Sequence, residues 1–227
     1  MKISDLVFKK VGKKKARSFI KKNHYTKGCG NAIISHGIYD KFANLVGVIA
    51  YQCPISENVR KSVFGSQHKD KVIELHRLVT LDECPKNTES WFISKSLDKL
   101  KKETSYWAVI SFADATMGHV GKIYQASNAI YTGKTSKNVY YKDSSRKLRP
   151  PRQNGRNISK EEARERGWSI EKRESKYRYL FLLENGKNKK ELKKMMKLKD
   201  MEYPDDDIEP IKTPTSSDID KRSVFDY

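Results

Sequence analysis

The chain has 227 residues, a formal net charge of +19 at pH 7, and hydrophobic residues at 37% of its positions. This length is enough for one packed domain with extensions. Three cysteines without a CxxC pair argue against a disulfide framework, and no apolar run approaches the roughly 20 residues of a membrane span. These features, with an N-terminus that has no apolar signal segment, predict a protein of the reducing cytoplasm without a membrane partner.

The charge imbalance indicates the kind of partner. Lys and Arg number 47 against 28 Asp and Glu. A positive field of this size attracts polyanions and releases their counterions, so we expect nucleic acid to be the partner. An anionic membrane surface and a charge that serves only solubility are the alternatives.

The first third of the chain predicts a helix and three strands. Residues 9–22 carry apolar residues at helical spacing, and this helix should stop near Asn23-His24. The β-branched runs 30–38 and 45–53 are joined by a short polar link and predict a hairpin. Residues 72–80 alternate as a third strand. We expect one face of that strand to carry Ile73, Leu75 and Arg77.

The next elements predict a parallel crossover. Pro85 precedes a helix that should run to about Lys102, and residues 106–113 form a fully apolar strand that ends at Asp114. A glycine-flanked turn, a short helix and another strand follow. This order predicts an α+β fold with a central mixed β-sheet flanked by helices.

Residues 134–178 are predicted to be a basic insertion. Arg and Lys alternate there with Tyr140, Tyr141, Trp168 and Tyr177, a composition that suits phosphate contacts and stacking on bases. A solvated insertion without a ligand is the alternative. The expected nucleic-acid contacts are Arg149, Arg152, Arg156, Lys176 and Arg178.

The remaining segments complete the predicted organisation. A short helix should end at Gly167, a strand should begin at Lys176, and a basic helix should cover 187–199. Residues 204–227 hold seven acidic and three basic residues. We therefore expect one domain over 1–203 and a disordered acidic tail over 204–227.

Two segments could carry chemistry. The loop before the helix at Asn87 and Thr88 could hold an anion such as a pyrophosphate on free backbone N–H groups, although an ordinary capped helix is the simpler interpretation. The buried strand delivers Asp114 to its carboxyl end, where ligands bind in open α/β sheets, and Tyr124 follows in the short helix. These two side chains could act as base and acid, or serve as a helix cap and a core aromatic.

Four segments of the sequence together resemble a known family. NHYTKGCG, ELHRLVTLDECPKNTES, VISFADATMGHVGKIYQASNAIYTG and KYRYLFLL with a following KKELKK occur in the order seen in the Mom family of phage DNA-modification proteins. The resemblance covers about residues 15–203. It implies a GNAT-like acyltransferase fold and the conversion of adenine in double-stranded DNA to a carbamoylmethylated adenine, which shields phage DNA from restriction in the host cytoplasm. A GNAT-like transferase acting on RNA or a small amine, and a DNA-binding protein without catalysis, remain alternatives.

The same resemblance implies roles for five residues. His24 and Tyr25 match a paired His-Tyr of the catalytic centre, with iron possible at His24. Arg77 matches an arginine that serves an acyl-CoA-like donor, and Asp114 and Tyr124 match the catalytic aspartate and tyrosine. We expect these five side chains to face one cavity, with Asp114 and Tyr124 closest to a flipped-out base.

Overall fold

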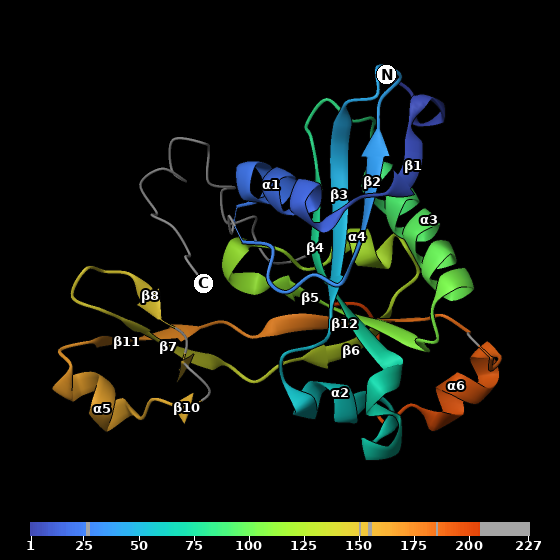
Figure 1. Cartoon of the computed structure of the whole chain (residues 1–227). Coiled ribbons are helices and arrows are strands. Elements are labelled where there is room, and N and C mark those ends of the chain that lie inside the picture. Colours follow the sequence, from blue (N-terminus) through green and yellow to red (C-terminus); the bar gives the residue numbers. More distant parts are fainter. Residues whose placement is uncertain (26–27, 150, 154–155, 185, 205–227) are drawn as a thin grey trace.

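A seven-stranded mixed sheet forms the centre of the protein in a computed structural model, which describes residues 1–25, 28–149, 151–153, 156–184 and 186–204 (Figure 1). The strand order is β1-β2-β3-β4-β5-β12-β6, and β4 and β5 are the parallel neighbours. The strands of this sheet are β1 (Val7–Lys10), β2 (Ile34–Tyr39), β3 (Leu45–Gln52), β4 (Val72–Thr80), β5 (Ala108–Asp114), β12 (Lys176–Leu182) and β6 (Ile130–Lys134). The predicted α+β class with a central mixed sheet flanked by helices is confirmed.

Helices cover both faces of this sheet. The α-helices are α1 (Lys13–Asn23), α2 (Glu57–Phe64), α3 (Thr88–Glu103), α4 (Lys122–Gln125), α5 (Lys160–Glu165) and α6 (Lys189–Met195), of which α5 packs within the insertion and not on this sheet. Side chains of α3 and α4 join one apolar cluster with Ile73 and Leu75. On the other face α1 packs through Ala16 and Ile20, and α2 and α6 pack around Ile110. Removing these apolar surfaces from water is the main source of stability. Within the described part, no helix is long and apolar enough to cross a membrane.

The predicted hairpin, the strand at 72–80 and the helix after Pro85 are confirmed, but the start of the chain differs from the prediction. Lys9 and Lys10 belong to edge strand β1, in which Lys10 pairs with His36 of β2, and α1 begins only at Lys13. The strand forms because Phe8 gains contact with the core. The predicted basic helix over 187–199 shortens to α6 for a similar reason, because Met196 and Leu198 pack on the core beyond its end.

The strand β12 occupies the place between β5 and β6. Leu180 pairs antiparallel with Ile110 on one side and with Ile130 on the other. The connection from β4 through α3 to β5 is the predicted parallel crossover. Because β5 has hydrogen-bonded neighbours on both sides, the prediction of a central, buried strand is also confirmed.

The basic insertion folds as a small unit with its own core, seen at the lower left of Figure 1. Its three-stranded sheet has the order β11-β7-β8, with β11 (Ser169–Arg173), β7 (Asn138–Lys142) and β8 (Leu148–Arg149). A second, two-stranded sheet pairs β9 (Arg152–Gln153) with β10 (Arg156–Asn157). Tyr141 is buried in this core and donates a hydrogen bond to the Ile158 carbonyl at 3.0 Å. Tyr177 is also buried, so the proposed stacking of Tyr141 and Tyr177 on bases is wrong. Residues 205–227, nearly all of the predicted tail, lie outside the described residues.

Candidate active site

The strands β4 and β5 stop pairing where the site begins. Their parallel ladder ends at Leu75 and Ser111, although β4 continues to Thr80 and β5 to Asp114. Beyond that point the facing backbone groups of the two strands do not bond to each other. Backbone N–H and C=O groups need partners, so this stretch can accept a ligand that supplies them.

A β-bulge at His76 turns the side chains of β4. In the ladder with β3, Tyr51 pairs with Leu75 and Ala50 with Arg77, which leaves His76 as an extra residue. A bulge of one residue moves the following side chains to the other face. The prediction that Arg77 shares a face with Ile73 and Leu75 is therefore wrong.

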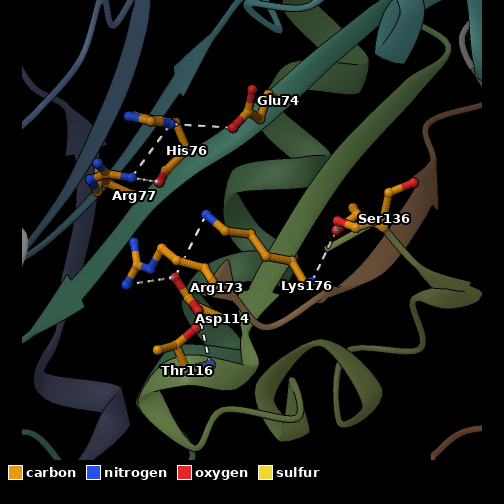
Figure 2. A network of polar contacts seen from close by, with 9 residues as sticks. Glu74, His76, Arg77, Asp114, Thr116, Ser136, Arg173 and Lys176 are labelled. Carbon is orange, nitrogen blue, oxygen red and sulfur yellow. Dashed lines mark hydrogen bonds and ion pairs between the residues drawn. The ribbon is translucent and has the colours of Figure 1, made fainter. Parts of the chain in front are cut away.

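The chain that follows α1 rests on this bulge. Arg77 donates from Nε to the Gly28 carbonyl at 2.8 Å and from Nη1 to the His76 carbonyl at 2.7 Å. At Gly30, where φ is +59°, a Cβ would lie 2.7 Å from His76 Nε2. Glu74 Oε1 lies 3.2 Å from His76 Nδ1, while burial lowers the pKa of the His76 imidazole (Figure 2). Arg77 and His76 thus hold the chain at Gly28 and Gly30, shortly after His24 and Tyr25 in the sequence.

Asp114 is held at the end of β5 by both a backbone donor and two cations. Its Oδ1 accepts the Thr116 N–H at 3.0 Å, which caps the short 3-10 turn Ala115–Met117. Its Oδ2 lies 3.7 Å from Lys176 Nζ and 3.9 Å from Arg173 Nη2 (Figure 2). The helix-cap interpretation of Asp114 is therefore correct, and the same carboxylate also has a second oxygen in a cationic environment.

Tyr124 reaches the same region from α4. The turn before it depends on Gly121, where φ is +90° and a Cβ would lie 2.3 Å from Cε2 of Tyr179. The Tyr124 ring packs 5.3 Å from the Tyr179 ring. Burial raises the pKa of Tyr124, and a hydrogen bond with Ser111 opposes that shift. The phenol is therefore neutral at neutral pH and can donate a hydrogen bond.

His24 and Tyr25 lie at the end of α1. The His24 N–H closes the helix on the Ile20 carbonyl at 2.9 Å, and the imidazole is buried. The two rings stack with centroids 4.4 Å apart, and the Tyr25 ring lies 6.1 Å from the His119 ring. This packing fixes the direction of the Tyr25 phenol.

Tyr25 is the residue in electrostatic contact with the other predicted site residues. Burial, followed by the charge of Asp114, raises the pKa of Tyr25 to about 12, whereas Arg77 and Arg173 act in the opposite direction. Tyr124 also contributes to this shift. Asp114, Arg77 and Tyr124 thus all act on the Tyr25 phenol, and His24 stacks on its ring.

Asp114 and Tyr124 approach this region from opposite faces of the sheet. Successive residues of a strand alternate between faces, so Asp114 shares the face of Phe112, which packs with the α2 and α6 cluster. Tyr124 belongs to the α3 and α4 cluster with Ala113. The expectation that all five side chains face one cavity is wrong. The arrangement places Tyr25 near two groups that come from the two sides of the unpaired stretch.

The predicted cofactor residues have limited capacity to bind a ligand. Thr88 is fully buried, and both its hydroxyl, at 2.6 Å, and its N–H, at 3.1 Å, bond to the Pro85 carbonyl. Asn87 is in the left-handed region at φ +67° and makes no side-chain cap, so its exposed amide stays available. Of this pair, Asn87 is the better candidate for a donor contact.

The side chains around His24 do not fit a resident metal. In the described ranges, no group of three or more His, Cys, Asp or Glu side chains is placed to hold a metal ion. A protein iron site needs several such ligands. The described residues around His24 therefore do not form an iron site.

The cations predicted to contact DNA all have partners inside the protein where their side chains are described. Arg149 Nε donates to Asp143 Oδ2 at 2.9 Å, and Arg156 Nη2 donates to Glu162 Oε1 at 2.6 Å. Arg178 donates to the Thr132 hydroxyl at 2.9 Å and to its carbonyl at 2.7 Å, and Lys176 faces Asp114. The side chain of Arg152 lies outside the described part.

Arg173 is the site residue that the sequence did not reveal. It lies at the end of β11, with its guanidinium 5.3 Å from the centre of the Tyr140 ring and 3.9 Å from Asp114. It therefore links the insertion to the candidate active site. Many other arginines and lysines surround Arg173 in the sequence, and nothing there distinguishes it as the residue that contacts Asp114.

Fold and site together define a strongly basic α+β protein with an enzyme-like polar centre where two parallel strands part. Residues 5–205 match the model of the Mom protein family, and the chain belongs to that family. It is 31% identical over 131 residues to the methylcarbamoylase Mom of Escherichia phage Mu, a match that covers 56% of this chain and 54%, about half, of that relative.

Solved acetyltransferase structures are also similar to this chain. The spermidine/spermine N-acetyltransferase SpeG from Vibrio cholerae is 12% identical and matches with a TM-score of 0.47 over 80% of this chain and 95% of its own. The GNAT family N-acetyltransferase YhbS from Escherichia coli, solved with CoA, is 11% identical and matches with a TM-score of 0.41 over 55% of this chain and 68% of its own.

Proposed function

We propose that this protein converts adenine in double-stranded DNA to N6-carbamoylmethyladenine and thereby protects the DNA from restriction in the cytoplasm of the host cell. Membership of the Mom family carries the proposal. The name of the phage Mu relative, a methylcarbamoylase, supports the reaction class. The net charge of +19 supports a polyanionic substrate.

The substrate atom imposes two requirements on the site. The N6 amino group of adenine is paired inside a duplex, so the base has to be flipped out at a cost of a few kcal/mol. Its lone pair is delocalised into the ring, so the site has to stabilise charge as the nitrogen reacts. Preorganised donors and a nearby acceptor meet the second requirement.

The residues around Tyr25 can divide these tasks. We assign Asp114 the role of orienting the N6 amino group and accepting its proton, with Arg173 and Lys176 holding the carboxylate in place. Tyr25 and Tyr124 remain protonated because their pKa values are raised, so they can donate hydrogen bonds to developing negative charge.

His24 and Arg77 act at the edge of this centre. His24 stacks on Tyr25 and fixes its ring, and Arg77 holds the Gly28 carbonyl. In this assignment both residues position the segment that carries Tyr25. A direct contact of Arg77 with the donor remains part of the proposal, because its second terminal nitrogen is not used by those bonds.

An acyl-CoA-like donor fits the unpaired stretch between β4 and β5, where backbone groups can bond to the amides of such a molecule. Attack of an amine on a thioester carbonyl would join N6 to an acyl carbon. A carbamoylmethyl group joins N6 to a methylene carbon instead. The donor therefore has to present an electrophilic methylene: the N–C bond forms, the bond to the leaving group breaks, and the N6 proton passes to Asp114.

The test is mass spectrometry of nucleosides from cells that express the protein and from cells with an empty vector. We expect an adenine nucleoside heavier by one carbamoylmethyl group in the DNA fraction of the expressing cells. The adduct in RNA, or on small amines, would replace the proposal with a transferase of another substrate class. Unmodified nucleic acids and amines would leave a DNA-binding protein without catalysis.

A further inference from the structure

The helix α1 carries many cations and no acidic residue. Its eleven residues, KKKARSFIKKN, include six Lys and Arg. Only Ala16 and Ile20 are buried, so the cations project into solvent. Lys14, Arg17 and Lys21 follow one another three and four positions apart, and such positions form a single stripe on a helix.

The lysines in the first turn of α1 are unfavourable for the helix itself. The amino end of a helix carries positive partial charge, so each cation in the first turn destabilises the helix. The helices α5 and α6 begin as helices normally do, with side-chain caps at Ser159 and Asn188 and acidic residues in the first turn. By contrast, the first turn of α1 has no acidic residue to offset its lysines, and Gly12 provides no side-chain cap.

The stripe also differs in its partners from the cations predicted to contact DNA. Arg149, Arg156 and Lys176 face carboxylates of the protein. Among the residues that the structure describes, no carboxylate lies within ion-pair distance of Lys14, Arg17 or Lys21. A row of cations without a carboxylate partner, of which Lys14 is unfavourable for the helix, points to an anionic ligand outside the protein.

The position of the stripe indicates which anion. From Lys14 to Lys21 a helix rises about 10 Å, and the phosphates of one DNA strand recur roughly every 3.4 Å along the duplex axis. The stripe can therefore follow about three successive phosphates. At its carboxyl end α1 continues directly into His24 and Tyr25.

We infer that α1 is the surface that holds the phosphate backbone of the DNA strand whose base is modified, with Lys14, Arg17 and Lys21 as the contacts. The inference rests on the proposed function in one respect, the delivery of the base to Tyr25. The contact surface itself is independent of the chemistry. The insertion then contributes less to affinity than its composition predicts, because its described arginines are paired.

The test compares two variants that lose the same net charge. One carries Lys14→Gln, Arg17→Gln and Lys21→Gln in α1. The control carries Lys189→Gln, Lys190→Gln and Lys194→Gln in α6, where these lysines are exposed and α6 lies far from α1 (Figure 1). Affinity for a duplex is measured from 50 to 200 mM salt, together with the thermal midpoint.

We expect the α1 variant to bind duplex DNA at least about tenfold more weakly at 100 mM salt, and the slope of log affinity against log salt to shrink by about 2.7. Its thermal midpoint should change little, because the unfavourable charge of Lys14 in the first turn and the favourable charge of Lys21 in the last turn are removed together. The control should keep the wild-type salt slope. The charge-conserving variant Lys14→Arg, Lys21→Arg should keep wild-type affinity.

Equal losses in the α1 and α6 variants would mean that only net charge matters and would overturn the inference. Wild-type affinity of the α1 variant would also overturn it. Failure of the proposed function has a different signature. DNA would then lack the modified adenine in wild-type cells while its binding still depended on α1.

Discussion

A buried histidine in the core makes the stability of this protein depend on pH in a way that can be calculated. His36 lies in β2 and is 1% exposed, with Nδ1 2.7 Å from Ser96 Oγ, and the hydroxyl of buried Tyr51 lies 2.6 Å from the same Ser96 oxygen. Burial lowers the pKa of His36 from 6.5 to about 4. The unfolded chain therefore binds a proton at a pH where the folded protein does not.

The sign and size of the effect follow from this difference. Stability is complete above about pH 6.5 and falls as the pH drops toward 4, because the unfolded state takes up more protons in that window. At 1.36 kcal/mol for each pKa unit, the loss approaches roughly 3 kcal/mol. Urea unfolding of the wild type and of His36→Asn, from pH 7.5 to 4.5, isolates the contribution of this residue.

The variant should be less stable than the wild type at pH 7.5, because the smaller side chain leaves a cavity beside Phe8 and Tyr51. As the pH falls, the difference between the two free energies of unfolding should shrink by about 2–3 kcal/mol. Parallel curves would refute the argument. Carboxylates elsewhere titrate equally in both proteins and cancel in the difference.

Further substitutions separate chemistry from structure. Tyr124→Phe deletes one buried hydroxyl, so DNA modification should fall at least about tenfold, while duplex affinity measured by filter binding should stay within about twofold of the wild type. A wild-type level of modification would remove Tyr124 from the mechanism. Gly121→Ala places a Cβ against the Tyr179 ring at positive φ, so the free energy of unfolding should fall by about 1–3 kcal/mol and the thermal midpoint by several degrees. An unchanged midpoint would contradict this close contact. Arg149→Gln with Arg156→Gln frees two paired carboxylates and should weaken duplex binding by less than the loss in the α1 variant; an equal or larger loss would move the main DNA contact to the insertion.

Local sequence patterns predicted most of the helices and strands, because the spacing of apolar residues along the chain reflects which face of each element is buried. The alternation in 72–80 and the helical spacing after Pro85 reproduce β4 and α3 nearly residue for residue. The edge strand β1 was missed because a strand of four residues with two lysines has no periodicity to detect. Its pairing depends on β2, which lies far along the chain.

The candidate site depended more on long-range geometry. The buried strand correctly placed Asp114 at its carboxyl end. The bulge at His76 reversed the face of Arg77, and nothing in the sequence marks which residue of a strand is extra. The contact of Arg173 with Asp114 forms through the folded insertion and could not be read from spacing.

The most direct test of the proposed chemistry compares DNA from cells that express the wild type with DNA from cells that express Asp114→Asn at equal levels of folded protein. Asparagine keeps an oxygen that accepts the Thr116 N–H, so the turn and the duplex affinity should survive while the charge is lost. Mass spectrometry of the nucleosides should show the carbamoylmethylated adenine in wild-type DNA and none above background in the variant. Equal amounts of the modified base in both samples would contradict the role of Asp114, and its absence from the wild-type sample would contradict the proposed reaction.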